Sequence, residues 1–564
     1  MHWSGTLDDY LTDRLLGLGK EDQLRASPAL QEADIVIVGS GPNGLVLANY
    51  LARAGLEVAV VECARTIGGG LSTEEITLPL FKHNLHAFFM RWTPNYRLWT
   101  DLDLGSTGVK MILPERQNAL PTSEGRVLIA FNDPERTRQS IAKFATEDAE
   151  SFATLLGESE RLSATIIEPM RFAPPLPVHE RNELLSSSAE GRRFQQLSEM
   201  SALDVVKDNF RSEEMRALVL FTAALRGYLP VLDVAGTGYV VAQAIAGLIN
   251  CRIVEGGSHE LALALAAQLY EHGGTIQTNN GVAEVTVVEG RATGVVLADG
   301  SRVRARRAVV SNVPAPLTLL DMVGRNHLDP SVVSALEGYA WNGEALFGAH
   351  LALDGPPSFG DRERGIEALN LCLGYESSAD VERDIAEVRG GSIPSTAALH
   401  ASVPTMNDPT QAPSGKHVAF GWQFVPSRPE GQDSSWWSEE QCDKQRDAMV
   451  DTWVRYAPNV ADIELARAAH SPLDTQLAVP SMWLGDRHHG SYHPENSYEL
   501  RPAPGLADYR TPIEGLYLCG SSNHPGGSVN GIPGYNAAGV VASDLGIEQW
   551  WNPPDVRSHL RSLG

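Results

Sequence analysis

The chain has 564 residues, of which 43% are hydrophobic and 20% charged, so it is long enough for a large core and for more than one domain. Its 70 acidic residues outnumber the 45 basic ones, and the resulting net charge of −25 argues against nucleic acid or an anionic membrane as a partner. The five cysteines are scattered and include no C-x-x-C pair. That pattern excludes a disulfide framework and favours a reducing, cytoplasmic location.

Two stretches bear on membranes and secretion. Residues 1–33 carry several charges and no continuous apolar core, so we expect a short helical extension and not a secretory signal. The longest uncharged run lies between Asp233 and Arg252, but glycines and polar residues interrupt it. A buried helix or pocket wall is therefore expected there, and membrane contact is at most peripheral.

A dinucleotide-binding pattern follows the extension. The apolar run 35–38 predicts a buried parallel strand, and Gly39, Gly41 and Gly44 follow it at G-x-G-x-x-G spacing. The first glycine allows a tight turn, the second lets the backbone approach a pyrophosphate, and the third lets the next helix, over 43–53, pack closely. The helix N-terminus would then face the anion.

A second predicted strand, 58–61, ends at Glu62, roughly 20 residues after the first glycine, where an acid that binds ribose hydroxyls is expected. A carboxylate would repel a 2′-phosphate, so FAD or NAD is favoured. Beyond it, Arg65 could reach a phosphate or ribose, and the consecutive glycines Gly68–Gly70 indicate backbone lying against something bulky and flat.

The segment from Phe81 to Trp99 is dense in aromatic residues and histidines, which indicates either a packed aromatic core or the wall of a cofactor pocket. Residues 101–250 alternate helical patterns with polar segments and form the first candidate substrate region. A helix pattern over 261–270, a hairpin within 282–300 and a buried strand near 308–314 then resume the nucleotide domain.

From about residue 316 to 500 the chain is richer in proline, tryptophan and acidic loops. A histidine-rich loop contains His488 and His489, but these are adjacent and no carboxylate spacing supports a metal site, so none is predicted. The last block, 515–539, predicts a strand, a long glycine-rich loop and a helix.

Four blocks stand in a characteristic order. They are Gly39-x-Gly41-x-x-Gly44, Glu62-x-x-Arg65-x-x-Gly68-Gly69, Val254-Glu-Gly-Gly257, and Leu518 to Gly527 with Gly534-Tyr-Asn-Ala-Ala538. Together they resemble the phytoene dehydrogenase-like family of FAD-dependent oxidoreductases in the amine oxidase superfamily, and most of all its pyridine nucleotide-disulfide oxidoreductase domain 2-like branch. One position differs from the family pattern. Relatives commonly carry arginine where this chain has Gly70, and this difference weakens the analogy with amine oxidases.

The resemblance implies an α/β fold with two domains. The first is a Rossmann-type FAD-binding domain assembled from the discontinuous segments 34–100, 251–315 and 505–564. The second is an α+β substrate-binding domain, with a mixed sheet and helices, built from 101–250 and 316–504.

FAD is the cofactor that the resemblance implies, with Glu62 on the adenosine ribose, Arg65 near the ribose or phosphates, and the backbone of Val282 on the adenine. The full set of expected cofactor contacts is Gly39, Gly41, Pro42, Asn43, Gly44, Glu62, Cys63, Arg65, Gly69, Gly70, Leu71, Val282, Gly520, Ser521, Gly531 and Ile532. A helix beginning near Gly534 would direct its positive end at the flavin.

The expected activity is desaturation of a carbon–carbon bond in an apolar or alicyclic substrate, such as a ring ketone, a ketoacid or a polyene. Hydride would pass to flavin N5, and oxygen or a quinone-like acceptor would reoxidise the flavin, because only one dinucleotide fingerprint is present. The alternatives are a redox-neutral double-bond isomerase, an amine oxidase, and a non-catalytic flavoprotein that acts through partners. The oligomeric state stays open, with a homo-oligomer as one alternative.

Residues near the flavin in the linear sequence are candidates for chemistry. Tyr535, His524 and His86 are the candidate catalytic residues. Arg91 and Arg226 could bind a substrate carboxylate, since a guanidinium matches it in a bidentate way, and Tyr228 is the third substrate-binding candidate. Structural roles stay open as alternatives: helix packing for Tyr535, loop hydrogen bonding for His524, and structural ion pairs for Arg91 and Arg226.

Overall fold

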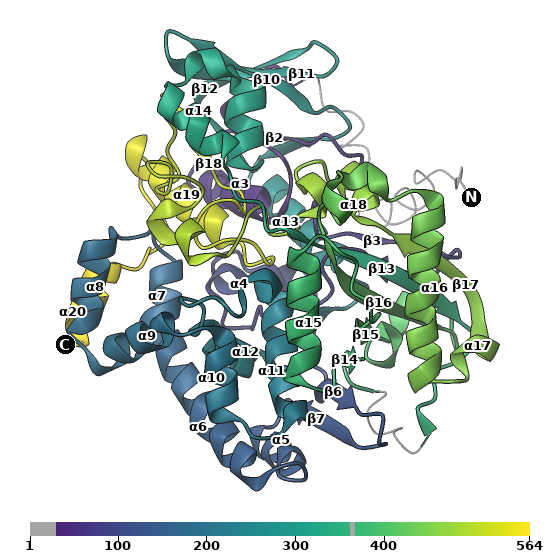
Figure 1. The fold of residues 1–564 in the computed structure, drawn as a ribbon. Helices are drawn as coiled ribbons and strands as arrows, with labels where there is room; N and C mark the ends of the chain where they lie inside the picture. Colours follow the sequence, from purple (N-terminus) through teal and green to yellow (C-terminus); the bar gives the residue numbers. More distant parts are fainter. Residues whose placement is uncertain (1–29, 361–366) are drawn as a thin grey trace.

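The computed structural model describes residues 30–360 and 367–564, and two seven-stranded sheets organise them (Figure 1). Most of the extension predicted over 1–33 lies outside the described residues. Its last two residues, Glu32 and Ala33, begin the first strand. No helix in the described part of the chain is long and apolar enough to cross a membrane.

The first sheet contains the dinucleotide-binding pattern. Its strands run in the order β10-β11-β12-β1-β2-β9, and β18 pairs with β12 on the side branch. The bounds are β1 Glu32–Val38, β2 Val58–Val61, β9 Thr275–Gln277, β10 Val282–Val288, β11 Arg291–Leu297, β12 Arg302–Ser311 and β18 Leu516–Leu518. β1 is parallel to β2 and β12, β2 is parallel to β9, and β12 is parallel to β18, whereas β10 and β11 form the predicted antiparallel hairpin.

Strand β1 is buried on both faces, which explains its continuous apolar run. Ile35 and Ile37 belong to the cluster beneath helices α3 (Pro42–Arg53), α13 (His259–Glu271) and α19 (Ile532–Asp544), whereas Val36 and Val38 belong to the cluster on the opposite face. Successive residues of β1 alternate between the two clusters because successive side chains of a strand point to opposite faces of the sheet.

The cluster on that second face also takes in the π-helical segment η5 (Leu317–Gly324) and α14 (Pro330–Glu337). In Figure 1, α14 lies beside β10 to β12. Residues 317–337 therefore share their core with the dinucleotide sheet, and the domain boundary expected after residue 315 stays a prediction.

The second sheet has the order β17-β13-β16-β15-β14-β6-β7, with bounds β6 Arg116–Pro121, β7 Val127–Phe131, β13 Glu344–Leu353, β14 Asn370–Leu373, β15 Leu399–Ser402, β16 His417–Pro426 and β17 Glu464–His470. It is mixed, because β14 is parallel to β6 while its other pairs are antiparallel. Helix α16 (Glu439–Tyr456) packs on one face through Met449 and Trp453. Two short ribbons, β3 (Thr73–Glu74) with β4 (His83–Asn84) and β5 (Met111–Ile112) with β8 (Ile253–Val254), complete the strands.

A block of helices packs against the other face of the second sheet. Its helices are α5 Pro134–Ile141, α6 Thr146–Leu162, α7 Glu168–Arg171, α8 Val178–Ser186, α9 Ala189–Glu199, α10 Ala202–Asn209, α11 Glu213–Ala223, α12 Val240–Gly247 and α15 Ser378–Arg389. The remaining α-helices are α4 Arg97–Asp101, α17 Val460–Ile463, α18 Pro472–Ala478 and α20 Val556–Ser562.

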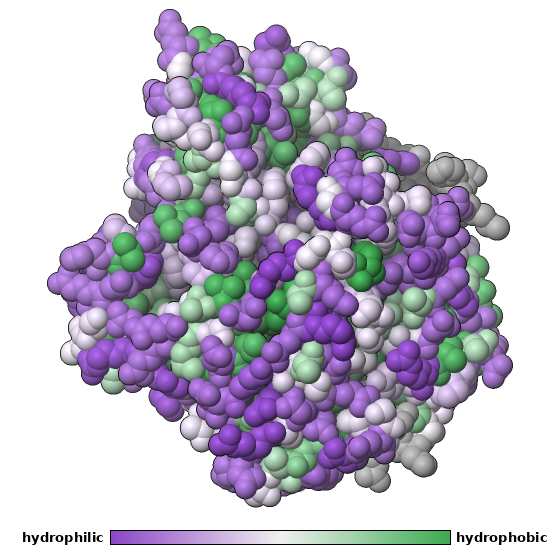
Figure 2. All heavy atoms as spheres, in the orientation of Figure 1, coloured by the Kyte–Doolittle hydropathy of each residue, from purple (hydrophilic) through white to green (hydrophobic). Residues whose placement is uncertain are grey.

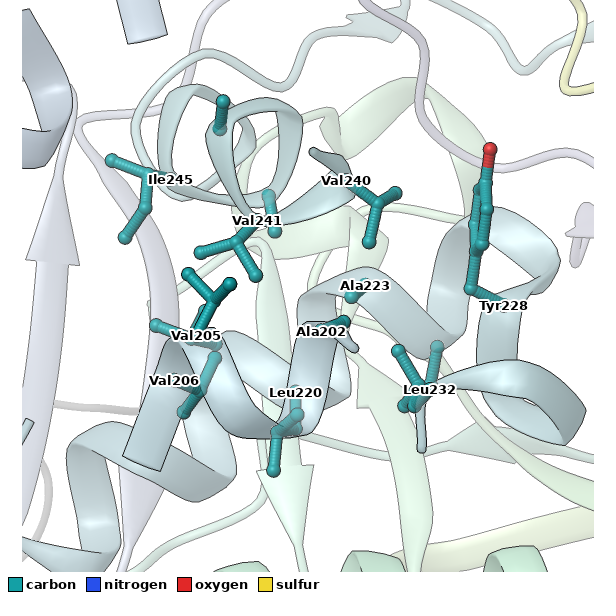
Figure 3. Close-up of a cluster of buried hydrophobic side chains, with 14 of the residues drawn as sticks. Ala202, Val205, Val206, Leu220, Ala223, Tyr228, Leu232, Val240, Val241 and Ile245 are labelled. Carbon is teal, nitrogen blue, oxygen red and sulfur yellow. The ribbon is translucent and has the colours of Figure 1, made fainter. Parts of the chain in front are cut away.

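Figure 3 shows the centre of that block, where Val241 of α12 faces Val205, and Ile245 and Val240 lie to either side of it. The uncharged run between Asp233 and Arg252 is thus a buried helix, as predicted. The outer face drawn in Figure 2 is mostly hydrophilic, with hydrophobic residues gathered near its centre.

Candidate functional site

A cavity of about 1130 Å³ is lined by segments from both sheets and from the helical block. Ligand pockets usually measure roughly 300–1,000 Å³, so this cavity has room for more than one small molecule. At one end lie the β1–α3 turn, Glu62 and Val282; at the other lie residues of α12 and of the second sheet. One continuous space therefore joins the dinucleotide pattern to the predicted substrate region.

The nucleotide end is shaped by the turn between β1 and α3. Gly39 has a φ of 93°, which an L side chain rarely adopts. Helix α3 begins after Gly41 without a side-chain cap, so its first N–H groups are available to an anion. A methyl on Gly44 would lie 2.3 Å from the carbonyl oxygen of Gly39, which confirms that this glycine is needed for close packing.

Asn312 is a cavity residue that the sequence motifs did not predict. It follows β12, the strand beside β1, and its Nδ2 would lie 2.7 Å from a methyl on Gly41. The available signal was its position at the carboxyl end of a neighbouring parallel strand, where such sheets bind ligands. Gly41 thus has two reasons to be glycine: approach to a phosphate and contact with this amide.

Glu62 lines the cavity but is already well bonded. Its Oε2 accepts hydrogen bonds from the Ser40 N–H at 2.8 Å and from the Ser40 hydroxyl at 2.7 Å. Its Oε1 accepts from the Ala64 N–H at 2.9 Å and from the Cys63 thiol at 3.2 Å. These donors fill the carboxylate's capacity, so a ribose hydroxyl would replace one of them, and the weak thiol donor is the easiest to replace.

The structure brings ten of the predicted cofactor residues to the cavity wall: Gly39, Gly41, Pro42, Asn43, Glu62, Cys63, Gly69, Gly70, Val282 and Ser521. The others, Gly44, Arg65, Leu71, Gly520, Gly531 and Ile532, do not line it. Leu71 is fully buried, and Gly520 packs against the backbone of Asn312. Ile532 donates its N–H to Asn530 Oδ1 at 2.9 Å, and Asn530 and Val529 line the cavity in place of the Gly531-Ile532 turn.

The cavity fits a dinucleotide with a free ribose 2′-hydroxyl. The uncapped first turn of α3 would hold the pyrophosphate, Glu62 would hold the ribose, and Val282 lies at the same end for the adenine. Gly69 and Gly70 continue the wall toward the second sheet, and Gly69 has a φ of 53°. Their lack of side chains leaves room for a flat ring.

The other end of the cavity combines aromatic walls with arginines. Phe88, Phe89, Leu346, His400 and Trp422 provide a largely apolar surface. Phe88 and Trp422 each pack against Phe420, with ring centroids 5.0 and 4.6 Å apart. Arg91, Arg171, Arg226 and Arg487 also line the cavity. Arg171 and Arg487 were not predicted from the sequence, which carried no local signal for them.

The three catalytic candidates lie in different places. His86 lines the main cavity, and its Nε2 has no hydrogen-bond partner among the described residues. Its ring lies 5.0 Å from that of His470. Burial holds the pKa of His86 well below its ordinary value, with a smaller effect from His470.

Tyr535 and His524 do not line the main cavity. The Tyr535 ring packs 5.1 Å from Tyr50, and its hydroxyl lies 3.5 Å from the carbonyl oxygen of Asn552. The Nε2 of His524 lies 3.0 Å from the carbonyl oxygen of Met170, and burial lowers the pKa of His524 to about 4. Packing of α19 thus places Tyr535 away from the main cavity, and the contact with Met170 does the same for His524.

Tyr228 and His524 line a second, smaller cavity of about 70 Å³, together with Arg226. The Tyr228 ring stacks on Tyr492 at 4.7 Å, and its hydroxyl lies 3.2 Å from that of Tyr239. Tyr228 does not line the main cavity, although Arg226 and several other residues line both cavities.

The histidine-rich loop turns inward. Asp486 accepts hydrogen bonds from the N–H groups of His488, Gly490 and Asn342 at 2.8 to 2.9 Å, and this brings His488 and His489 to the main cavity. Across residues 30–360 and 367–564, no group of three or more His, Cys, Asp or Glu side chains could hold a metal ion.

A Rossmann-type sheet whose nucleotide cradle continues into a cavity under a mixed sheet is the architecture of a two-domain flavoprotein oxidoreductase. The flavin containing amine oxidoreductase family matches residues 43–534, and the chain belongs to this family. It is a flavin-dependent oxidoreductase and its cofactor is FAD, which confirms the cofactor and the family inferred from the sequence motifs.

Several proteins are similar over nearly their whole length. One of the limonene dehydrogenase subunits of Castellaniella defragrans is 28% identical over 95% of this chain and 99% of that protein. Pyridine nucleotide-disulfide oxidoreductase domain-containing protein 2 of Mus musculus is 30% identical over 91% of this chain and 94% of its own. The lycopene-forming phytoene desaturase of Pseudescherichia vulneris is 24% identical over 91% of this chain and 99% of that protein.

Among solved structures, putrescine oxidase bound to putrescine has a TM-score of 0.57 at 17% identity, covering 91% of this chain and 99% of that one. Cyclohexylamine oxidase from Brevibacterium oxydans has a TM-score of 0.55 at 19% identity, with the same coverage. At these identities the likeness establishes the fold alone.

Proposed function

We propose that this protein dehydrogenates a carbon–carbon bond of a small alicyclic or polyene-derived substrate, with oxygen or a quinone as the electron acceptor. The observation that carries the proposal is the single cavity, whose nucleotide end continues into a wall of Phe88, Phe89 and Trp422. The names of the limonene dehydrogenase and phytoene desaturase relatives, which are similar over nearly their whole length, support the same reaction class.

The chain's own residues have two tasks in this proposal. The aromatic wall holds the substrate by apolar contact and excludes water from the reacting carbon atoms. His86 accepts the proton that leaves the adjacent carbon, because its imidazole is neutral at physiological pH and its Nε2 has no partner among the described residues. When bound, FAD supplies the acceptor for the hydride.

Amine oxidation is disfavoured by the charge of the substrate end. Arg91 and Arg226 line it and form no ion pair with a carboxylate of the described residues, so they would repel a protonated amine that binds beside them. The putrescine and cyclohexylamine oxidases share the fold with this chain, but at 17 to 19% identity their substrates do not transfer.

The experiment is an anaerobic visible spectrum of the purified holoenzyme, recorded before and after addition of ring ketones, ring ketoacids, amines and polyenes. We expect the flavin bands to bleach with a ring compound or polyene and to recover when oxygen or a quinone is added. Bleaching by amines alone would contradict the proposal. Product formation without bleaching or acceptor use would replace it with double-bond isomerisation.

A further inference from the structure

Five arginines and five carboxylates line the cavity, so the arginines that lack a carboxylate partner are the ones of interest. Arg171 is paired with Glu168 at 2.7 Å, Arg487 is paired with Glu344, and Arg97 donates to the carbonyl oxygen of Asn552 at 3.0 Å. Arg91 and Arg226 have no such carboxylate partner in the part of the chain that the structure describes. Two arginines therefore line the cavity without a direct ion pair to a carboxylate of the described residues.

Both of these arginines lie against the same face of helix α12. The core face of this helix is formed by Val240, Val241 and Ile245, as Figure 3 shows. Its cavity face is formed by Gln243, Ala246 and Asn250. This spacing follows the helical period, so one stripe of α12 is a wall of the cavity.

Arg226 is tied to the first turn of that stripe, because its Nη2 donates to Gln243 Oε1. A neutral amide orients the guanidinium but leaves its charge in place. Arg91 lies against the next turn: a methyl on Gly247 would be 2.4 Å from Arg91 Nη2 and 2.9 Å from its Cζ. Because residues four apart on a helix are neighbours, the two arginines contact adjacent turns of α12.

Arg91 has unused hydrogen-bonding capacity. Its Nε and Nη2 atoms are buried and lack a hydrogen-bond partner among the described residues. Leaving a buried charged donor unpaired is costly, and an anion bound in the cavity beside this guanidinium would stabilise its charge. The arrangement agrees with the pKa of Arg91, which burial lowers and the nearby Cys251 thiol partly restores.

We propose that Arg91 and Arg226 form a subsite for a carboxylate of the substrate, so that the enzyme acts on a ring or chain acid and not on a neutral hydrocarbon. A carboxylate can accept hydrogen bonds from two guanidinium groups at once, and each bond is charge-assisted. This inference rests on the proposed function for the reaction, but it concerns binding and is tested separately.

The probes are benzoate, cyclohexanecarboxylate, 4-oxocyclohexanecarboxylate and decanoate, each compared with its primary amide. Binding to the holoenzyme is measured from the change in the flavin absorption spectrum. We expect at least one acid to bind about tenfold or more tightly than its amide, which corresponds to about 1.4 kcal/mol. The variants R91Q and R226Q should each lose this preference and keep their flavin.

R252Q is the matched control. Arg252 pairs with Met90 through backbone hydrogen bonds of 2.8 and 2.9 Å, next to Arg91, but it does not line the cavity. This variant should keep the preference for the acid. G247A is a second test: it retains both charges but displaces the Arg91 guanidinium, and it should weaken acid binding with little effect on the amide.

The proposal is overturned if no acid binds more tightly than its amide, or if the preference survives in either R91Q or R226Q. Loss of FAD from R91Q would also overturn it, because the arginine would then serve the cofactor phosphates. The test of the reaction remains distinct. If acids bind preferentially but none bleaches the flavin, the carboxylate subsite stands and the proposed dehydrogenation is rejected. If only neutral compounds bleach the flavin, the dehydrogenation stands and the carboxylate subsite is rejected.

Discussion

Gly534 of α19 lies directly against the backbone carbonyl of Asn43 in the first turn of α3: a methyl on Gly534 would be 2.1 Å from that oxygen. The Asn43 side chain in turn donates to the Ser521 hydroxyl at 3.1 Å. The glycine-rich turn near the N-terminus and the C-terminal block are therefore in contact at the nucleotide end of the cavity. This contact holds the α3 N-terminus in the position where it would bind a pyrophosphate.

Replacing Gly534 with alanine should force these two helices apart. Overpacking of this kind typically costs about 1–3 kcal/mol, so we expect a lower free energy of unfolding and a lower flavin content in G534A. Urea denaturation and the ratio of flavin to protein absorbance are the measurements.

The matched control is G539A in the same helix, where an added methyl has no atom within 4 Å. Alanine is a better helix former than glycine, so G539A should be neutral or more stable by up to about 1 kcal/mol. Equal effects of the two substitutions would show that the contact with Asn43 has no special importance.

Replacing Glu62 with alanine should weaken FAD retention. We expect this carboxylate, which lines the cavity, to accept a ribose hydroxyl, and hydrogen bonds to a charged group are worth about 1.5–3 kcal/mol each. We expect FAD to dissociate on dialysis of E62A under conditions in which the unaltered protein keeps it. Because the Ser40 and Ala64 N–H groups also lose their acceptor, apoprotein stability should fall as well. Unchanged flavin occupancy would contradict the ribose assignment.

Replacing His86 with glutamine tests its proposed role as the base. We expect the rate of flavin reduction by substrate to fall by about 10²–10⁴-fold, with substrate affinity nearly unchanged. Because burial holds the pKa of His86 well below 6.5, the rate of the unaltered enzyme should show no inflection from this group between about pH 6 and 8.

H272Q serves as the control for that experiment. His272 follows α13 and does not line the cavity; one of its ring nitrogens lies 2.8 Å from the carbonyl oxygen of Gln268. A normal reduction rate in H86Q, or an equal loss in H272Q, would remove His86 from the mechanism.

Asp384 should make stability depend on pH. It is fully buried in α15, Tyr375 donates a 2.5 Å hydrogen bond to its Oδ2, and burial raises its pKa from 3.8 to about 7. Between about pH 4 and 7 the native protein therefore binds a proton that the unfolded chain has released. The free energy of unfolding should therefore fall as the pH rises through this range, by up to about 1.4 kcal/mol per pH unit. Above about pH 7 this group should cause no further decrease.

The variant D384N keeps a polar partner for Tyr375 and cannot ionise. Relative to the unaltered protein, it should gain stability as the pH rises from about 5 to 8, as measured by urea denaturation at both values. A constant difference between the two proteins would show that the Asp384 carboxyl does not have a raised pKa.

The local units of the nucleotide domain are encoded by the sequence alone. The run from β1 through Gly39 to α3 and β2, the β10–β11 hairpin, and the strand and helix of the C-terminal block were all predicted, because strand periodicity, glycine turns and helix patterns depend on neighbouring residues. The motifs also identified the family and FAD, since four spaced blocks in one order are rare by chance.

Which side chains meet in the cavity depends on packing between distant elements. Arg91 and Arg226 both contact α12 because this helix places Gln243 and Gly247 on adjacent turns. Asn312 reaches the nucleotide turn because β12 pairs with β1, although the two strands are far apart in the sequence. Tyr535, near the flavin in linear order, is turned away by the packing of α19 on Tyr50. Sequence patterns report local conformation and burial, whereas these contacts arise only when the folded elements pack together, and no local pattern encodes that.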